Sequence, residues 1–372
     1  MSNVTLAELR SIGLTAGLAA VGCTHAEPFV DTERVLVERK EAGLHGGMQF
    51  TYRNPPRSTT PNRALAGVAS LIVGAWPYAH SSAADAETNS DGDTGPRGTI
   101  AAYAWRDHYG DLRNALGQIA DALIAAGFEA RVLADDNALV DRAAAVRAGI
   151  GWFGKNSNVL VPNAGSWFVL GSVLTTAPLE NDSAVSPGCG PCRRCLDGCP
   201  TGAIVASGVV DARRCLAWLL QQEGDFPQEF RVPLGSRLYG CDDCQEVCPP
   251  SRGHDVDLVG DEVADVDLIA LLDADDDAIT DAHGRWYIPR RDMDYVRRNA
   301  LVALGNVVAD SPALIDASRA SIERYLSHAE PMLRRHAAWA AGRTSDERLA
   351  AVVAATGEID LMAEFDVARA AS

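Results

Sequence analysis

The sequence predicts a chain of three successive parts: an α/β domain, a small cysteine-rich metal domain and an all-α tail of helical repeats. Three observations support this. Helix and strand patterns alternate through about the first 180 residues, eight of the nine cysteines fall between positions 189 and 248, and two tail segments superpose at an offset of 37 residues. At 372 residues, the chain also exceeds what one hydrophobic core usually spans. The α/β domain is expected over residues 1–180, the ferredoxin-like cysteine-rich domain over 181–252 and the helical tail over 285–372, with a linker over 253–284.

The α/β domain rests on alternating apolar patterns. Residues 68–76 form an apolar run closed by Pro77, which predicts a buried strand, and residues 111–126 form an amphipathic helix ended by Gly127. The same patterns predict helices at 6–14 and 139–148 and strands at 18–21, 128–133 and 167–174. Alternation of this kind is typical of a sheet covered by helices.

Charge is distributed unevenly along the chain. The formal net charge of -17 argues against a protein that coats nucleic acid, because phosphate binding depends on Lys and Arg. Residues 251–282, however, carry eleven acids against one arginine, whereas residues 285–343 carry ten arginines against six acids. The acidic run predicts a solvated linker over 253–284, and the tail beyond it is locally positive.

No segment predicts a membrane span. The longest apolar stretch, residues 64–79, is interrupted by two glycines and Pro77 and is shorter than the ~20 residues that a bilayer requires. Residues 14–23 could pass for a signal segment that ends in Cys23, but no twin-arginine pair precedes them, and Glu8 offsets Arg10. We therefore expect no membrane association and a reducing, cytoplasmic location.

The cysteines predict two [4Fe–4S] clusters. Residues 189–200 read C-x2-C-x2-C-x3-C-P, the run of bacterial ferredoxins, in which three cysteines hold one cluster and the fourth reaches a second. Residues 241–249 repeat the pattern with one cysteine fewer, which Cys215 can supply. We assign one cluster to Cys189, Cys192, Cys195 and Cys248, and the other to Cys199, Cys215, Cys241 and Cys244. Zinc is the competing metal, but this spacing suits one face of a cube better than a tetrahedron.

Residues 149–156, GIGWFGKN, resemble the start of a phosphate-binding P-loop. Asn156 stands where Ser or Thr should bind magnesium, and a helix rather than a strand precedes the segment, so nucleotide hydrolysis is not expected. Glycines allow close approach of a ligand to the backbone, and Lys155 is one of only two lysines. The alternative is a tight turn with an exposed lysine.

The tail predicts helical repeats of the HEAT type. Residues 295–306 and 332–343 both begin with an apolar residue and paired arginines, continue with an alanine-rich face and place a glycine near the end. Two unrelated amphipathic helices are the alternative. The paired arginines could hold phosphates on one face, or they could pair with acids between repeats: Arg297, Arg298, Arg334 and Arg335.

Five segments together resemble the epoxyqueuosine reductase family over roughly residues 5–345. They are residues 140–156, 164–175, 189–204, 240–249 and 297–306. The resemblance implies an enzyme that reduces epoxyqueuosine to queuosine at the wobble position of tRNA, using cob(I)alamin fed by two [4Fe–4S] clusters. It implies that residues 1–180 bind cobalamin, that the partner is a tRNA with a GUN anticodon, that a ferredoxin- or flavodoxin-type donor supplies electrons, and that the chain is a monomer.

The resemblance also implies functional residues in the α/β domain. The family's proton donor is an aspartate just upstream of the glycine-rich segment, which matches Asp135, although Asp136 is the alternative because residues 136–138 replace Thr-Gly-Pro. Opening an epoxide produces an alkoxide that needs a proton, and a carboxyl with a raised pKa can supply it. The expected cobalamin contacts are Tyr103, Asp107, Gly151, Trp152, Gly154, Lys155, Asn156 and Ser166.

Two other functions remain as alternatives. A reductive dehalogenase-like enzyme would use the same cofactors on a small molecule, but such enzymes typically carry a twin-arginine signal and lack a repeat tail. A simple electron-transfer ferredoxin on a scaffold would leave the first 180 residues without a function.

Overall fold

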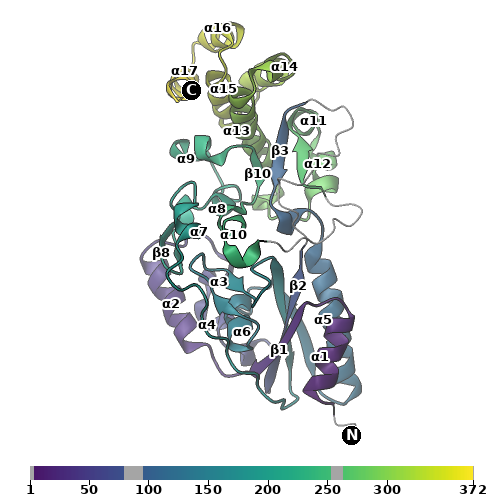
Figure 1. The fold of residues 1–372 in the computed structure, drawn as a ribbon. Coiled ribbons are helices and arrows are strands. Elements are labelled where there is room, and N and C mark those ends of the chain that lie inside the picture. Colours follow the sequence, from purple (N-terminus) through teal and green to yellow (C-terminus); the bar gives the residue numbers. More distant parts are fainter. Residues whose placement is uncertain (1–3, 79–94, 253–262, 372) are drawn as a thin grey trace. The chain divides into compact units, whose positions relative to one another are not determined.

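The computed structural model describes residues 4–78, 95–252 and 263–371 (Figure 1). The chain forms two compact units, each built from three separate segments and each described here by itself. The first unit comprises residues 1–85, 106–213 and 243–260. The second comprises residues 86–105, 214–242 and 261–372. The four sequence-based domain boundaries remain a prediction.

The core of the first unit is a four-stranded sheet in which every neighbouring pair is antiparallel. Its order is β1 (Ala20–His25), β2 (Ser70–Pro77), β7 (Phe168–Thr175) and β4 (Ala130–Ala134). Gly74 of β2 lies opposite Val21 of β1 and Gly171 of β7, which fixes the register across three strands. The four strands predicted from the sequence are therefore confirmed.

Helices cover both faces of this sheet. On one face, α1 (Leu6–Thr15) packs against α5 (His108–Ala125), which buries Leu112, Leu116, Ile119 and Leu123 along one stripe. On the other face, α6 (Asp141–Arg147) buries three alanines against Leu71 and Val73. Because both faces are covered, β2 reads as a continuous apolar run rather than an alternating one.

The remaining helices and strands of the first unit lie outside this sheet. They are α2 (Val30–Glu41), α3 (Phe50–Arg53), α4 (Pro55–Ser58), β5 (Trp152–Phe153), β6 (Val159–Leu160), α7 (Arg194–Asp197), β8 (Ile204–Ala206), β9 (Val209–Val210) and α10 (Asp243–Glu246).

The second unit combines a small sheet with a stack of helices. Strand β3 (Arg97–Ile100) pairs in parallel with β10 (Arg237–Tyr239) and antiparallel with β11 (Asp265–Asp267). The helices are α8 (Leu216–Leu219), α9 (Gln228–Leu234), α11 (Leu268–Asp273), α12 (Asp276–His283), α13 (Asp294–Asp310), α14 (Ile315–Leu326), α15 (Pro331–Arg343), α16 (Glu347–Thr356) and α17 (Ile359–Ala370).

The acidic segment differs from the linker that its charge predicted. Residues 253–262 lie outside the described residues, but 263–284 form β11, α11 and α12. Asp267 and Asp275 accept hydrogen bonds from the first backbone N–H groups of α11 and α12. Leu268, Leu271 and Leu272 are buried. Two of the acids therefore cap helices. A count of net charge does not register the leucines between the acids, which form the buried face.

The two repeated tail segments are helices α13 and α15, as predicted. Helix α15 packs against both α13 and α17, and α14 and α16 pack beside them. The glycines that the two segments share lie where successive helices touch. A Cβ on Gly305 would lie 2.9 Å from the Ala340 Cα, and one on Gly342 would lie 2.3 Å from the Phe365 carbonyl oxygen. The shared glycine is therefore needed for helix approach.

Among the described residues, no helix is both long and apolar enough to cross a bilayer.

Replacing Gly342 with alanine should destabilise the second unit by about 1–3 kcal/mol, because the added methyl group overlaps backbone atoms. Chemical denaturation would measure the change. The matched control is Gly117→Ala in α5, where nothing lies within 4 Å of the added Cβ. That variant should gain about 0.5–1 kcal/mol from helix propensity. Equal effects in the two helices would contradict the packing argument.

Candidate metal centre and acid cluster

The first predicted cluster set lies together in the first unit. Cys195 and Cys248 are buried, and Cys189 and Cys192 are half-buried. Burial raises the pKa of the Cys195 and Cys248 thiols, and the neighbouring thiols of the set raise it further. Thiolates that repel one another in a buried site require a cation between them. The thiols of Cys189, Cys192, Cys195 and Cys248 are therefore neighbours, and that they bind one cluster remains a prediction.

The all-sulfur donor set of these four residues is of the kind that iron–sulfur clusters use. Within the described ranges, no three His, Cys, Asp or Glu side chains are grouped as one metal ion requires. A four-iron cube binds its thiolates at outer corners, farther apart than the ligands of a tetrahedral zinc.

The second predicted set draws on both units. Cys199 and Cys244 belong to the first, and Cys215 and Cys241 to the second. The Cys199 sulfur accepts a hydrogen bond from the Ala203 N–H at 3.2 Å. Cys215 precedes α8, and Cys241 follows β10 closely. That these four cysteines share one cluster remains a prediction.

The GIGWFGKN segment forms the β5–β6 hairpin, whose tip contacts both cysteine runs. The Lys155 ammonium donates to the carbonyls of Gly190 at 2.7 Å and Cys192 at 2.8 Å. The Asn156 amide donates to the Cys244 carbonyl at 3.1 Å. The Lys155 ammonium is therefore half-buried and bound to the first cysteine run, at the tip of a tight hairpin.

The hairpin also forms the apolar wall of the first set. Trp152 packs against Cys248 and Cys189, and its buried indole N–H has no partner among the described residues. An N–H group in this position can donate to a cluster sulfur, which supports the fit of an iron–sulfur centre. Gly151 and Gly154 are required by the hairpin itself: a Cβ would lie 2.1 Å from the Leu160 carbonyl oxygen and 2.6 Å from the Asn156 amide oxygen, respectively.

The segment around Ser166 holds the chain on both sides of Cys248. The Ser166 hydroxyl donates to the Gln245 amide oxygen at 3.0 Å, and the Trp167 indole donates to the Ser251 carbonyl at 2.9 Å. The Tyr78 hydroxyl donates to the same Gln245 oxygen at 3.1 Å. The sequence did not indicate Tyr78, Gln245 or Ser251, because separate single residues form no motif.

The two remaining predicted cofactor residues lie in different units. Asp107 begins α5, accepts a hydrogen bond from the Gly110 N–H at 2.8 Å and pairs with Arg113 at 3.7 Å. In the second unit, the Tyr103 hydroxyl accepts from the Gln221 amide at 3.2 Å. Asp107 therefore has a local structural role as a helix cap. No geometry described here joins it to Tyr103.

Three aspartates form an acid cluster after β4. Asp135 adopts a positive φ of 53°, which Asp tolerates better than most residues, and its carboxylate makes no hydrogen bond within the described part of the chain. Burial raises its pKa, opposed by Arg113 and helped by Asp136. The Asp136 side chain accepts a hydrogen bond from the Ala138 N–H at 2.8 Å, as in a turn. Between the two alternatives, this geometry favours Asp135 as a proton donor.

Asp141 is the member of the cluster that sequence reasoning did not single out. It begins α6, and one of its carboxylate oxygens is buried without a partner among the described residues. Burial raises its pKa well above the ordinary value, and Asp135 and Asp136 raise it further. The only sequence sign was its spacing, six residues after Asp135.

The four repeat arginines bind within the protein. Arg297 pairs with Asp276 at 2.6 Å, Arg334 pairs with Glu358 at 3.3 Å, and Arg335 pairs with Asp225 at 2.8 Å. Arg298 is fully buried and donates to backbone carbonyls. Three of the four thus pair with acids, and Arg298 binds backbone carbonyls instead.

These features define an iron–sulfur oxidoreductase. Residues 188–251 match the family model described as a 4Fe-4S double cluster binding domain. An epoxyqueuosine reductase of Bacillus anthracis is 32% identical over 339 residues, covering 88% of this chain and 86% of the relative. The chain belongs to the epoxyqueuosine reductase family.

Solved structures agree with this assignment. An epoxyqueuosine reductase with an epoxyqueuosine-modified tRNA-Tyr stem loop aligns with a TM-score of 0.85 at 29% identity, covering 97% of both chains. The Bacillus subtilis enzyme, solved with the catalytic loop that bears an aspartate swung out of its active site, aligns with a TM-score of 0.84 at 29% identity, again over 97% of both chains.

Asp141→Asn should flatten the pH dependence of stability. Folding raises the pKa of Asp141, so the stability that its protonated form contributes is complete below the ordinary value of 3.8 and is lost as pH rises through the raised pKa. Asparagine has no such proton. Between about pH 4 and about pH 8, the Tm of the variant should therefore fall less than that of the wild type. Asp121→Asn, at an exposed site on α5, should keep the wild-type profile.

Lys155→Met should lower the iron bound by the first cysteine run, because the loop loses both donors that hold its carbonyls. Iron analysis after anaerobic reconstitution would show a loss approaching about four of about eight irons. Lys40→Met is the control, since Lys40 binds only the Tyr52 carbonyl on the surface. Unchanged iron in the Lys155 variant would contradict the role of this contact.

Proposed function

We propose that this chain reduces epoxyqueuosine to queuosine at the wobble position of a tRNA with a GUN anticodon. The observation that carries the proposal is Asp135, a solvent-accessible residue whose carboxyl has a raised pKa and no hydrogen bond in the described residues, held on a loop of the first unit. Family membership supplies the reaction class, and one solved relative carries a modified tRNA stem loop.

The reaction requires both electrons and protons. Converting an epoxide to an alkene consumes two electrons and two protons and releases one water. Asp135 gives a proton to the ring oxygen as its carbon–oxygen bond breaks. Burial and Asp136 keep that carboxyl protonated closer to neutral pH, while Arg113 limits the shift so that the proton can leave. Asp141 adds a carboxyl beside it that is itself buried.

The iron–sulfur part of the proposal rests on the double cluster binding domain. We propose Cys189, Cys192, Cys195 and Cys248 as ligands of one [4Fe–4S] cluster, and Cys199, Cys215, Cys241 and Cys244 as ligands of the other. The grouping of the first four thiols and the buried indole N–H of Trp152 support this assignment.

Cobalamin is the second proposed cofactor, held by the α/β part within residues 1–180. When bound, it supplies the strongly reducing centre that opens the epoxide. Asp135, whose carboxyl has a raised pKa and lies on the same unit, fits the need for a proton donor beside that reducing centre. Tyr103, Asp107 and the hairpin and Ser166 segments remain proposed contacts. For Lys155, Asn156 and Ser166, any such contact comes in addition to the hydrogen bonds that they make to the cysteine segments.

We propose HEAT-like repeats for α13–α17, and we place the tRNA contacts elsewhere than on the four repeat arginines, whose guanidinium groups are already bound within the protein. A ferredoxin- or flavodoxin-type electron donor, a monomeric state and a cytoplasmic location also remain predictions. The small-molecule alternative has little support: a solved reductive dehalogenase aligns with a TM-score of only 0.42 at 18% identity, too weak a likeness to carry an argument.

Asp135→Asn should abolish most epoxide reduction, by about 10²–10⁴-fold, because asparagine cannot donate the proton. Asparagine also tolerates a positive φ, so the loop should keep its shape. The assay incubates the reconstituted protein with cobalamin, a strong reductant and epoxyqueuosine-containing tRNA, and then analyses the nucleosides.

Asp136→Asn is the matched control for this assay. The variant keeps the oxygen that caps the Ala138 N–H, and it should remain active. An active Asp135 variant beside an inactive Asp136 variant would transfer the role to Asp136. Wild-type protein that leaves epoxyqueuosine unchanged would refute the proposed reaction.

A further inference from the structure

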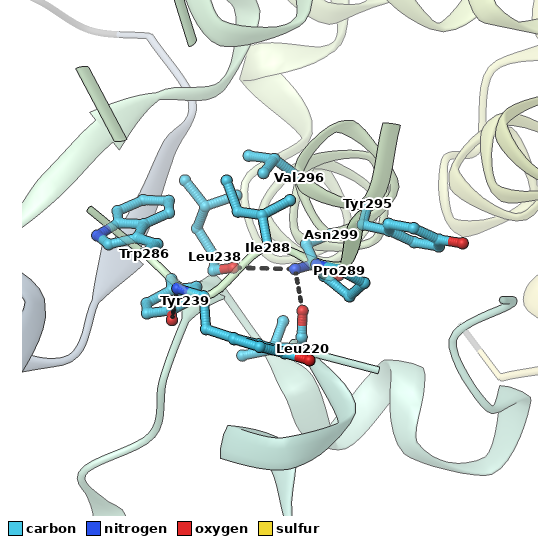
Figure 2. Close-up of a pocket in the computed structure, with 10 residues that line it drawn as sticks. Leu220, Leu238, Tyr239, Trp286, Ile288, Pro289, Tyr295, Val296 and Asn299 are labelled. Atoms are coloured by element: carbon cyan, nitrogen blue, oxygen red, sulfur yellow. Dashed lines mark hydrogen bonds between the residues drawn. The ribbon is translucent and has the colours of Figure 1, made fainter. Parts of the chain in front are cut away.

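The Asn299 amide joins the two chain segments that carry Cys215 and Cys241. Its nitrogen donates to the Leu220 carbonyl at 2.9 Å and to the Leu238 carbonyl at 3.3 Å, as Figure 2 shows. Leu220 directly follows α8, which begins after Cys215, and Leu238 lies in β10, three residues before Cys241. One buried side chain of α13 thus sets the separation of these two segments.

Arg298 fixes the orientation of that amide. Its guanidinium donates to the Asn299 side-chain oxygen at 2.8 Å and 3.1 Å, so the amide nitrogen must face the carbonyls. The remaining donors bind the carbonyls of Leu219, Leu220, Gln222 and Gly224. The loop that follows Cys215 is therefore bound at four points.

Arg335 and His336 of α15, which stand 37 residues after Arg298 and Asn299, bind the same loop. Arg335 pairs with Asp225, and the buried His336 ring accepts a hydrogen bond from the Phe226 N–H at 3.1 Å. Burial lowers the pKa of His336 well below its usual value, which keeps this ring nitrogen free of a proton and able to accept. The motif that reads as a helical repeat is thus also a set of donors and acceptors for residues 219–226.

Apolar packing completes the contact between the tail and this segment. Leu216, Leu219, Leu220 and Phe226 form one buried cluster with Val302 of α13 and Trp339 of α15, and Cys241 packs against it. The cavity beside Asn299 measures only ≈ 10 Å³, which holds at most about one water. The polar groups here therefore serve the fold around the cysteines rather than a ligand.

We propose that Arg298 and Asn299 are positioning residues for the second [4Fe–4S] cluster, which hold Cys215 and Cys241 at the separation that the cluster requires. This inference rests on the proposed assignment of those two cysteines as ligands. It gives the helical tail a role in metal binding, in addition to its structural one.

Asn299→Asp tests the proposal, because it replaces the donating amide with an oxygen that repels both carbonyls while preserving size. After anaerobic reconstitution, the variant should bind about four irons instead of about eight, and the electron paramagnetic resonance signal of one reduced cluster should be lost. The matched control is Asn306→Asp. Asn306 is equally buried on α13 and also donates to two carbonyls, those of Arg231 and Gly235, but it binds neither cysteine segment.

The outcomes separate a positioning role from a merely structural one. Retention of about eight irons by Asn299→Asp, or equal iron loss in both variants, would overturn the proposal. If Asn299→Asp does not fold, Arg298→Lys replaces it as the test, because lysine keeps the positive charge but loses the several N–H donors of the guanidinium. This variant should lower or shift the paramagnetic resonance signal of the second cluster more than Arg335→Lys does. Cys241→Ala must itself drop to about four irons. Failure there refutes the ligand assignment and this inference with it, whereas a normal drop beside an unaffected Asn299 variant refutes this inference alone.

Discussion

The structure depends on hydrogen bonds from side chains to the backbone carbonyls of the cysteine segments. Loops that bind metal through closely spaced cysteines form few hydrogen bonds of their own, so their carbonyls need donors from elsewhere. Lys155 and Asn156 provide these donors in the first unit, and Arg298 and Asn299 provide them in the second. Each pair is adjacent in sequence and lies in a segment that contains no cysteine. The backbone of the cysteine segments is thus held by side chains from outside those segments.

The same arrangement explains why so many polar side chains are buried without carboxylate partners. The Arg298 guanidinium is fully buried, and its acceptors among the described residues are carbonyl and amide oxygens. Burial lowers its pKa to about 10, which still leaves it charged at neutral pH. Several carbonyl dipoles solvate one cation in place of water, and the loop is rigid as a result.

The sequence predicted the helices and strands well and the contacts of individual side chains less well. Apolar periodicity located β2, α5, α13 and α15, because their buried faces are continuous in sequence. The cysteine spacing identified the 4Fe-4S double cluster binding domain because its runs are local patterns, whereas the distribution of the cysteines between two clusters remains a prediction. The high charge of the acidic segment predicted a linker, but Leu268 and Leu271 give it a buried helical face. The motifs around Lys155 and Ser166 indicate cofactor contacts, which remain a proposal, but they do not indicate the hydrogen bonds of these residues to the cysteine segments, because the partners lie far away in sequence. Pairing between distant segments leaves no local pattern.

The interleaved order of the second unit bears on how the protein is made. Its three segments are separated by parts of the first unit, and residues 214–242 bind donors located on α13 and α15. During synthesis, the ribosome releases Cys215 and Cys241 well before it releases Asn299 or His336. Until translation reaches the tail, these two cysteines belong to a segment without its anchors. Assembly of the unit around them therefore comes late in synthesis, and until then the exposed thiols are open to oxidation.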